Sequence, residues 1–237
     1  MNRYKILVAN DRDDLASKTT LIIVEHINNV LSQKDRVQIA LSGGSTPSAV
    51  YKLLSREDID WPQIDVFLGD ERWVDSNDKA SNSLMIKETL LSNFPGSQAC
   101  FHTVPTTTLP NPQASALAFS ELINRKCIGE PPVFDIMLLG LGEDGHTASL
   151  FPSTPSLHVF DKWTTISSGK GQDRITLTAP VLSAASKIIF LVSGDSKQVA
   201  LKRLLDPLEN SDRTPAKLVQ SVNEILVLAD QSAAGLI

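Results

Sequence analysis

The sequence predicts an α/β fold in which a mostly parallel, Rossmann-like open sheet is flanked by helices on both faces. Apolar runs of strand length recur along the chain, at 4–8, 37–41, 64–68, 134–139, 175–177, 188–192 and 225–228. Segments with helical periodicity lie between several of these runs, and such alternation is typical of parallel sheets. Glycine-rich turns follow two of the runs, as in proteins that bind ligands at the carboxyl ends of the strands.

The first half of the chain supplies three predicted strands and one long helix. Residues at the 3.6-residue helical period follow the run 4–8; they are Leu15, Thr19, Ile22, Ile23, Ile27, Val30 and Leu31. The run 37–41 leads into LSGGSTP, where Pro47 suits the first position of a helix. The run 64–68 ends in FLGDERW, and a Pro/Thr-rich loop at 102–112 is expected to cross the surface.

The second half of the chain completes the predicted sheet. The run 134–139 is bounded by Pro131, Pro132 and Gly140, which favours a buried strand. A second helical pattern follows the run 188–192 and Gly194, and consists of Val199, Leu201, Leu204 and Leu205. No repeat or low-complexity tract interrupts the pattern. We therefore predict one domain over residues 1–237.

Composition limits the classes of partner. The chain has 237 residues, of which 42% are hydrophobic and 21% are charged, and this suffices for a substantial core. A net charge of -5 without a Lys/Arg-rich run argues against a nucleic-acid or membrane-binding face, although a local cationic pocket is compatible with it. Without a long apolar or secretory segment, we expect a cytoplasmic protein with a small-molecule partner. The sequence leaves monomer and dimer open.

Neither the cysteines nor the histidines indicate a metal. Cys100 and Cys127 form no CxxC pair and have no histidine cluster at zinc-like spacing, so we expect free thiols and no structural metal. His26, His102 and His158 lie in a helical segment or near prolines and are expected to be structural.

The turn after 37–41 is a candidate anion site. Gly43 and Gly44 would let the backbone approach a phosphate, and Ser45 and Thr46 would present hydroxyls and amides at a helix N-terminus. A strand-to-helix turn with a Ser/Thr cap is the alternative. The GxxxxGK[ST] pattern of a Walker loop is absent.

The segment LLGLGEDGHTASLFP at 138–152 is the best candidate for catalysis. His146 would lie just beyond the carboxyl end of a strand, and imidazole exchanges protons near neutral pH. Asp144, two residues earlier in the glycine turn, is placed to fix the tautomer of the imidazole. Gly140, Gly142 and Gly145 also spell GxGxxG, but Pro152 and Pro155 leave little room for the helix of a dinucleotide site.

Further charged residues follow other strands. In an extended segment Asp70 and Arg72 would share a face, where one could orient a sugar hydroxyl while the other contacts an anion. A loop held by its own Asp–Arg pair is the alternative. Arg174 and Lys197 are cations that could face a site at the edge of the predicted sheet. Taken singly, each is expected to be a solvated surface charge.

Together these motifs resemble the 6-phosphogluconolactonase family, within the group that includes glucosamine-6-phosphate deaminases and isomerases. In order they are LSGGSTP, GDERWV, Ser81-Asn82, LGLGEDGHTASLFP, RITLTAPVLSAA and SGDSKQVALKRLL. Deaminases typically carry a glutamate five residues after the histidine and DEY at the strand end, where this chain has Phe151 and Arg72. The chain departs from many lactonases after DERWV, where 75–78 replace a proline-containing turn.

The resemblance implies a deaminase/isomerase-like fold and cofactor-free hydrolysis of 6-phospho-D-glucono-1,5-lactone to 6-phospho-D-gluconate in the oxidative pentose phosphate pathway. It implies that His146 is the general base and that Asp144 orients its imidazole. Asp70 would contact a substrate hydroxyl or take part in proton transfer. The expected substrate-binding residues are Gly43, Gly44, Ser45, Thr46, Arg72, Asn82, Arg174 and Lys197, without a metal.

Three other functions compete with this interpretation. A sugar-phosphate deaminase or isomerase would use the same turn for ring opening and Asp70 as base in enolisation, but Phe151 argues against it. A non-catalytic sugar-phosphate sensor would have no need of the intact Asp144–His146 turn. An NAD-dependent oxidoreductase would need the helix that the prolines disfavour.

Overall fold

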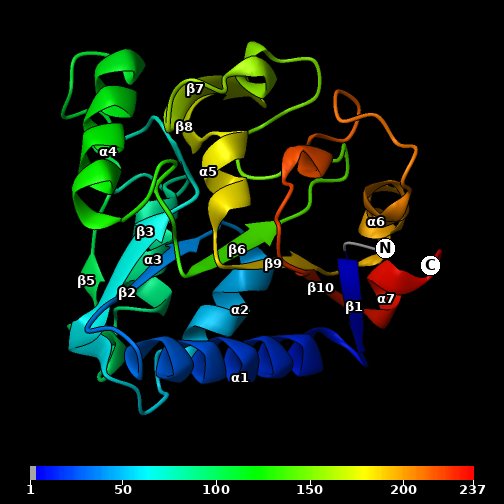
Figure 1. Ribbon diagram of the computed structural model, residues 1–237, viewed down its shortest axis with the longest axis horizontal. Coiled ribbons are helices and arrows are strands. Elements are labelled where there is room, and N and C mark those ends of the chain that lie inside the picture. The colour runs from blue at the N-terminus through cyan, green and yellow to red at the C-terminus, as the bar shows by residue number, and fades with distance from the viewer. Residues whose placement is uncertain (1–3) are drawn as a thin grey trace.

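The computed structural model describes residues 4–237 and contains a seven-stranded parallel sheet (Figure 1). Every neighbouring pair in this sheet is parallel. The order is β1 (Tyr4–Ala9), β10 (Ile225–Asp230), β9 (Lys187–Val192), β6 (Ile136–Gly140), β2 (Val37–Leu41), β3 (Ile64–Leu68) and β5 (Cys100–Phe101). The predicted α/β fold with a mostly parallel open sheet is confirmed.

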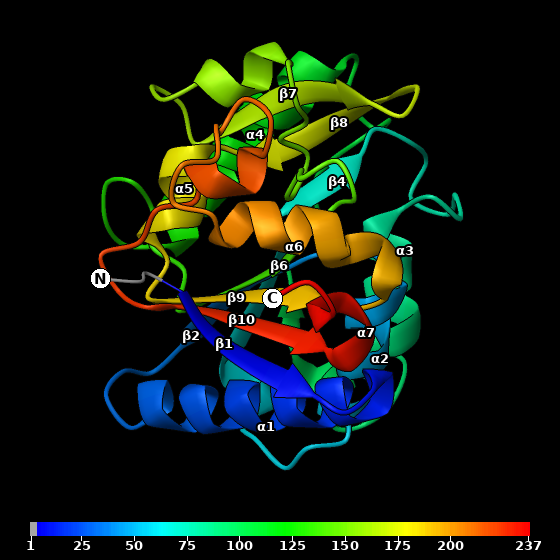
Figure 2. The same cartoon turned by 90° about the vertical axis from the view of Figure 1, so that its right-hand side faces the viewer.

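Helices cover both faces of the parallel sheet. α1 (Arg12–Leu31) and α2 (Ser45–Leu54) pack together on one face, and α5 (Ala179–Ala184) and α6 (Gln198–Leu205) lie on the other (Figure 2). The remaining α-helices are α3 (Asn82–Thr89), α4 (Pro112–Lys126) and α7 (Gln231–Ala234). Short 3₁₀ turns are η1 (Trp61–Gln63), η2 (Gly96–Gln98), η3 (Pro155–His158), η4 (Asp195–Lys197) and η5 (Pro215–Leu218).

Local sequence explains where the two N-terminal helices begin. Asp11 caps α1 and accepts hydrogen bonds from the backbone N–H groups of Asp13 and Asp14, which satisfies donors that the first turn leaves free. Gly44 caps α2 with φ 114°, so that helix begins at Ser45. The prediction that Pro47 takes the first helical position is therefore wrong, because Pro47 is the third residue of α2.

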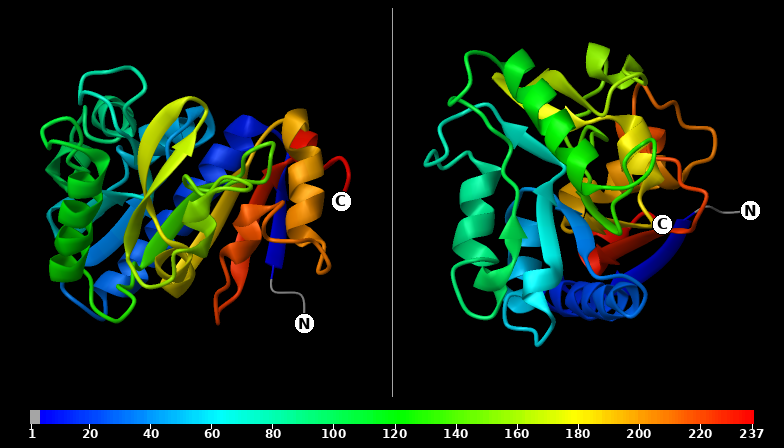
Figure 3. Two further views of the ribbon diagram at one scale, coloured as in Figure 1. Left: turned by 90° about the horizontal axis from the view of Figure 1, so that it is seen from above. Right: turned by 60° about the vertical axis from the view of Figure 1, so that its left-hand side comes forward.

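A second, antiparallel sheet lies over the face that carries α5 (Figures 1 and 3). It consists of β4 (Asp70–Arg72), β8 (Gln172–Leu177) and β7 (Thr164–Gly169), in that order, and α4 packs against β7 and β8. The run 175–177 was expected in the parallel sheet, and that expectation is wrong. Lys170 and Gly171 have φ of 56° and 76°, and this tight turn folds β8 back on β7 as a hairpin.

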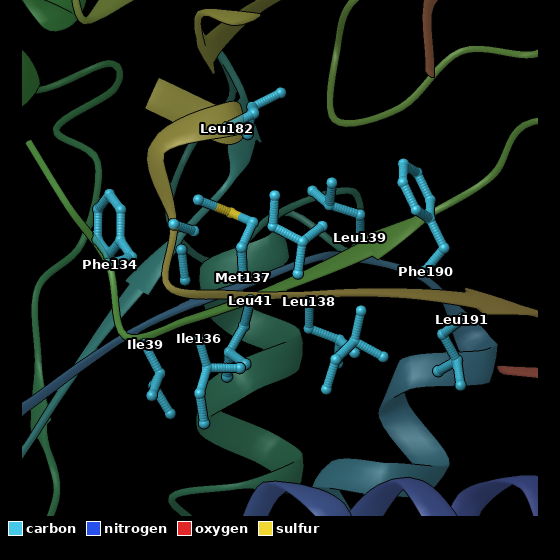
Figure 4. Packing of buried hydrophobic residues seen from close by; sticks show 14 of the residues in the cluster. Ile39, Leu41, Phe134, Ile136, Met137, Leu138, Leu139, Leu182, Phe190 and Leu191 are labelled. Carbon is cyan, nitrogen blue, oxygen red and sulfur yellow. The ribbon is translucent and has the colours of Figure 1, made fainter. Parts of the chain in front are cut away.

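The core lies on both faces of the parallel sheet. Met137 and Leu139 of β6 point to one face, whereas Ile136 and Leu138 point to the other (Figure 4). All four side chains are fully buried. A strand buried on both faces needs apolar residues at every position, which accounts for the continuous apolar run in the sequence.

Because the strands are parallel, the turns after them gather at one edge of the sheet. Gly43 follows β2, Asp70 follows β3, His146 follows β6 and Lys197 follows β9. These four strands are neighbours in the sheet. The fold thus brings the separate sequence motifs to one edge. Within residues 4–237, no helix is long and apolar enough to cross a bilayer.

Candidate active site

A pocket of about 190 Å³ opens at this carboxyl edge. The parallel sheet supplies its floor through the turns after β2, β3, β6 and β9, and the small sheet adds residues from the opposite side. The lining residues are Ser42, Gly43, Asp70, Arg72, Asn82, Gly140, Leu141, Gly142, His146, Ala148, Lys170, Arg174 and Lys197.

His146 is held by its neighbour in the glycine turn. Its Nδ1 lies 2.5 Å from Oδ1 of Asp144, and its backbone N–H donates to the same oxygen at 3.2 Å. An ionised carboxylate can only accept hydrogen bonds, so Nδ1 carries the proton. In the neutral ring Nε2 then keeps its lone pair, and this is the tautomer that a general base requires.

The contact with His146 also keeps the Asp144 carboxyl group ionised. Partial burial would raise the pKa of Asp144, but the hydrogen bonds from His146 and the positive charges of His146 and Lys170 outweigh it and lower the pKa to about 2. The carboxylate is therefore ionised throughout the neutral range. It can orient the imidazole and also stabilise an imidazolium formed during proton transfer.

Two glycines make room for the polar groups of the pocket. A Cβ at Gly142 would lie 2.0 Å from Nδ1 of His146, and one at Gly43 would lie 1.9 Å from Oδ1 of Asn82. Any side chain at either position would displace these groups. The glycines after β2 and β6 are therefore required by close packing inside the site.

Asp70 is fixed by a buried polar network. Its Oδ2 accepts a hydrogen bond from Ser149 Oγ at 2.5 Å, and its Oδ1 lies 3.4 Å from the Asn82 amide nitrogen. That amide also donates to the Asp70 backbone oxygen at 2.8 Å. Arg174 Nη1 lies 3.8 Å from Oδ2. Asp70 thus pairs with Arg174, and the alternative of a local Asp70–Arg72 pair does not describe this structure.

Glu71 is not among the residues that line the pocket, and it anchors α3. Its carboxylate accepts backbone hydrogen bonds from Arg72, Asn82 and Ser83, at 2.8, 2.7 and 2.7 Å. Two of these donors belong to the first turn of α3, where a negative charge also suits the helix dipole. Because Asn82 opens α3, Glu71 determines where the Asn82 side chain enters the pocket.

Four cationic side chains line the pocket, a composition that suits an anionic ligand although the protein as a whole is acidic. They are Arg72, Lys170, Arg174 and Lys197, whereas Asp70 is the one carboxylate among the described residues of the lining. Arg174 is 6% exposed, so the expectation that it is a solvated surface charge is wrong. Burial lowers the pKa of Arg174, but guanidinium remains charged at any pH of interest. Lys197 is partly buried, and its Nζ lies 3.8 Å from Glu143.

Two polar atoms of the lining have unused hydrogen-bonding capacity. Ser42 Oγ and Arg72 Nε are buried and have no hydrogen-bond partner within residues 4–237. Buried polar groups are nearly always paired, because an unpaired one costs about 1–3 kcal/mol. A polar ligand in the pocket would satisfy both atoms.

Phe151 forms a wall between two functional groups. Its ring centroid lies 4.4 Å from that of His146, and the guanidinium carbon of Arg174 lies 5.3 Å from the ring centre. An aromatic face attracts cations. The ring therefore contacts both the imidazole and the Arg174 guanidinium and helps to hold each in place.

Comparisons with known proteins place this architecture in a family. The family model described as glucosamine-6-phosphate isomerases/6-phosphogluconolactonase matches residues 10–228. The chain belongs to this family. It is 37% identical to the 6-phosphogluconolactonase of Synechocystis sp. over 221 residues, 92% of each chain. It is 36% identical to that of Nostoc sp. over 229 residues, 95% of each.

A solved structure of the family superposes on nearly the whole chain. The crystal structure of a 6-phosphogluconolactonase from Shewanella baltica has a TM-score of 0.87 and 25% sequence identity, and the match covers 96% of this chain and 97% of that one. This chain and that structure therefore share one fold over nearly their whole length.

The structure brings most, but not all, of the residues predicted from the family motifs into the pocket. Gly43, Asp70, Arg72, Asn82, His146, Arg174 and Lys197 line it, and Asp144 contacts His146. Gly44, Ser45 and Thr46 lie at the start of α2 and are not among the lining residues. Their role in binding substrate stays a prediction.

Other pocket residues were missed by the sequence analysis. Lys170 lies at the tip of the β7–β8 hairpin and lines the pocket, and Ser42 lines it from the end of β2. The GKG turn between two strand-like segments was the signal for Lys170. Nothing in the local pattern distinguishes Ser149 as the partner of Asp70, because the two are 79 residues apart.

The GxGxxG motif lacks the surroundings of a dinucleotide site. All residues from 141 to 154 are described, and none of them is α-helical. Gly145, at φ 87°, instead closes a turn that Gly142 begins. The helix N-terminus that would receive a pyrophosphate is therefore absent from this segment.

Proposed function

We propose that the chain hydrolyses 6-phospho-D-glucono-1,5-lactone to 6-phospho-D-gluconate as a cofactor-free enzyme of the cytoplasmic pentose phosphate pathway. The names of its relatives support this reaction. The observation that carries the proposal is that His146, held by Asp144, lines one pocket together with four cationic side chains. An anionic ester and a proton-transfer group would meet there.

The phosphate of the substrate binds among the cations. Arg174 and Lys197 provide the charge, and Lys170 at the hairpin tip adds to it. The backbone of Gly43 and Gly44 and the hydroxyls of Ser45 and Thr46 complete the phosphate site in this proposal. Charge-assisted hydrogen bonds to phosphate are roughly twice as strong as neutral ones, so this end of the substrate sets its orientation.

His146 activates the attacking water. Nε2 takes a proton from the water as its oxygen adds to the lactone carbonyl C1, and Asp144 stabilises the resulting imidazolium. The tetrahedral intermediate then breaks the bond between C1 and the ring oxygen. His146 returns its proton to the departing oxygen, which becomes the C5 hydroxyl. General acid–base help of this kind contributes about 10²- to 10⁴-fold in rate.

Arg72 and backbone amides of the glycine turns stabilise the negative oxygen of the intermediate. Arg72 Nε is buried and has no partner within the described chain, so it is free to donate. A well-placed oxyanion donor contributes about 10²- to 10³-fold. Asp70, held by Ser149 and Asn82, accepts a hydrogen bond from a substrate hydroxyl.

The experiment that tests the reaction uses freshly generated 6-phosphogluconolactone. Its decay is followed with and without enzyme, and the spontaneous hydrolysis is subtracted. We expect rapid phosphogluconate formation, and a much higher KM for the matched lactone without phosphate because the cations then lack their partner. Decay at the background rate with folded protein would contradict the proposal.

The same preparation tests the other activity in the family's name. Glucosamine-6-phosphate is offered in parallel, and ammonia release is measured. We expect none, because the glutamate typical of deaminases is replaced by Phe151, whose ring packs on His146. Ammonia release without lactone hydrolysis would favour a deaminase. No activity in either assay would favour a non-catalytic sugar-phosphate sensor.

A further inference from the structure

We infer that Asp65, Cys100 and His102 form a second site that binds a divalent transition metal such as Zn²⁺ or Co²⁺, separate from the pocket. One donor atom from each residue lies within 4.8 Å of the other two. Carboxylate oxygen, thiolate sulfur and imidazole nitrogen are the ligands that zinc takes in proteins. A solvent water would supply the fourth position.

The register of the sheet produces this cluster. β3 and β5 are parallel neighbours, and Asp65 is the direct partner of Cys100 across the ladder. His102 follows Cys100 by two residues, and its backbone N–H continues the ladder by donating to Val66 at 2.9 Å. Side chains two residues apart in an extended segment share a face. All three donors therefore project from one face at the edge of the sheet.

Asp65 is prepared as an anionic ligand. Its side chain is buried, and Arg36 and His102 each hydrogen-bond one of its carboxylate oxygens. Arg36 Nε lies 2.7 Å from Oδ2 of Asp65, and His102 Nε2 lies 2.6 Å from Oδ1. Metal-bound carboxylates are commonly held this way, with the second oxygen bonded to the surrounding protein.

His102 is also held in place before any metal arrives. Its ring stacks on Phe67 with centroids 4.6 Å apart and planes 24° from parallel. Phe67 is itself buried and packs edge-on against Phe134. The imidazole is therefore fixed by Phe67 on one face and by Asp65 at its edge, so little ordering remains for metal binding to require.

Cys100 completes the site from the solvent side. Its side chain is exposed and unpaired with another cysteine, so rotation can bring Sγ closer to the other donors. In a tetrahedral zinc site with bonds of about 2.0–2.3 Å, ligand atoms lie roughly 3.5 Å apart. To reach this geometry Sγ must move inward, and a metal must replace the proton between Asp65 Oδ1 and His102 Nε2, so that these two atoms separate from their present 2.6 Å. The exposed thiol also gives the metal a path from solvent.

The cluster lies far from the proposed active site. Asp65 is the second residue of β3, and Asp70 lies beyond its carboxyl end. At about 3.3 Å per residue, the two are roughly 16 Å apart along the strand. Linear spacing gave no sign of the cluster, because Asp65 joins the Cys100–His102 pair only through strand pairing. The expectation of no structural metal rested on that spacing.

Titration of the full chain with Co²⁺ tests the inference. We expect one Co²⁺ per chain, a near-ultraviolet thiolate-to-cobalt charge-transfer band, and loss of that band when Zn²⁺ is added. Cys127 is buried whereas Cys100 is exposed, so we assign the band to Cys100. Cys100→Ser should abolish the band and weaken Co²⁺ binding at least about tenfold, because even the loss of a group that only holds a metal ligand weakens binding by about 10- to 100-fold.

Controls separate the cluster from adventitious binding. His158→Ala removes an exposed histidine elsewhere on the chain and should leave the titration unchanged, whereas His102→Asn should weaken it. Circular dichroism verifies that each variant is folded. The inference is overturned if wild type shows no charge-transfer band, or if Cys100→Ser binds Co²⁺ as tightly as wild type. Neither readout depends on the proposed lactonase activity.

Discussion

The imidazole of His146 is held at two places, by the Asp144 carboxylate at Nδ1 and by the Phe151 ring on its face. Each contact has a distinct consequence for proton transfer. The carboxylate determines which nitrogen carries the proton and stabilises the charged ring. The aromatic face limits ring rotation and stabilises the positive charge that develops when the base is protonated.

Asp144→Asn tests the carboxylate with almost no change in shape. The amide has lost the negative charge and can donate to Nδ1, which would favour the tautomer with the proton on Nε2. We expect kcat to fall at least about a hundredfold with a small change in KM. Steady-state kinetics measure both, and a kcat within about threefold of wild type would remove Asp144 from the mechanism.

Phe151→Leu tests the ring contact. Aromatic contacts of this kind contribute about 0.5–1.5 kcal/mol, so kcat should fall roughly twofold to tenfold. Because the ring also holds Arg174, KM should rise. Phe160→Leu is the matched control, since that ring is exposed, and its kinetics should equal those of wild type. Equal kinetics for both variants would show that the ring has no role.

At the scale of elements, the pocket depends on how α3 and the small sheet meet the parallel strands. Glu71 anchors the first turn of α3 and so positions Asn82. The β7–β8 hairpin places Arg174 and Lys170 in the pocket from the side opposite the parallel sheet. The role of α3 and of the small sheet is to position side chains. Together they determine which side chains reach the substrate.

Glu71→Gln should loosen α3. The amide keeps one acceptor oxygen and loses the charge that faces the helix N-terminus, so part of the three backbone hydrogen bonds is lost. We expect the free energy of unfolding to fall by about 1–3 kcal/mol, and KM to rise because Asn82 shifts. Urea unfolding and kinetics measure these effects. Glu88→Gln, exposed on the same helix, should change neither; equal effects of both variants would contradict the anchoring role.

Elements defined by local pattern were predictable, and elements defined by distant pairing were not. The runs 37–41 and 64–68 are confirmed as strands with those bounds, because continuous apolar sequence specifies burial on both faces. The run 175–177 was assigned to the wrong sheet, because its hairpin partner β7 has a mixed polar sequence. Arg174 looked solvated for the same reason: the groups that bury it come from distant segments.

Across the whole molecule, the two ends of the parallel strands carry different polar groups. The carboxyl edge gathers cations around a pocket on a chain whose net charge is -5. The opposite end of β3 carries the Asp65 cluster with Arg36, Gln38 and His102. The pocket could be anticipated from family motifs, whereas the cluster could not, because strand register alone assembles it.

The buried Asp65 carboxylate should shape the acid unfolding of the protein. Its pKa is lowered from 3.8 to about 2 in the folded chain, so the unfolded chain binds more protons between these values. The stability that Asp65 contributes, about 2 kcal/mol, is complete above roughly pH 4 and is lost as the pH falls toward 2.

Urea unfolding at several pH values between 2 and 6 measures this contribution. In Asp65→Asn the loss of stability on acidification should be smaller than in wild type by about the same amount. Asp35→Asn removes an exposed carboxylate and should retain the wild-type slope. An unchanged slope in Asp65→Asn would contradict the lowered pKa.

Whether His146 is the catalytic base is tested by the enzyme-dependent decay of freshly generated 6-phosphogluconolactone, measured for wild type and for His146→Ala with both proteins shown to be folded. If His146 is the base that activates water, kcat in the variant falls at least about a hundredfold while substrate still binds. A kcat within about threefold of wild type would show that another group takes the proton, and the account of this site would fail.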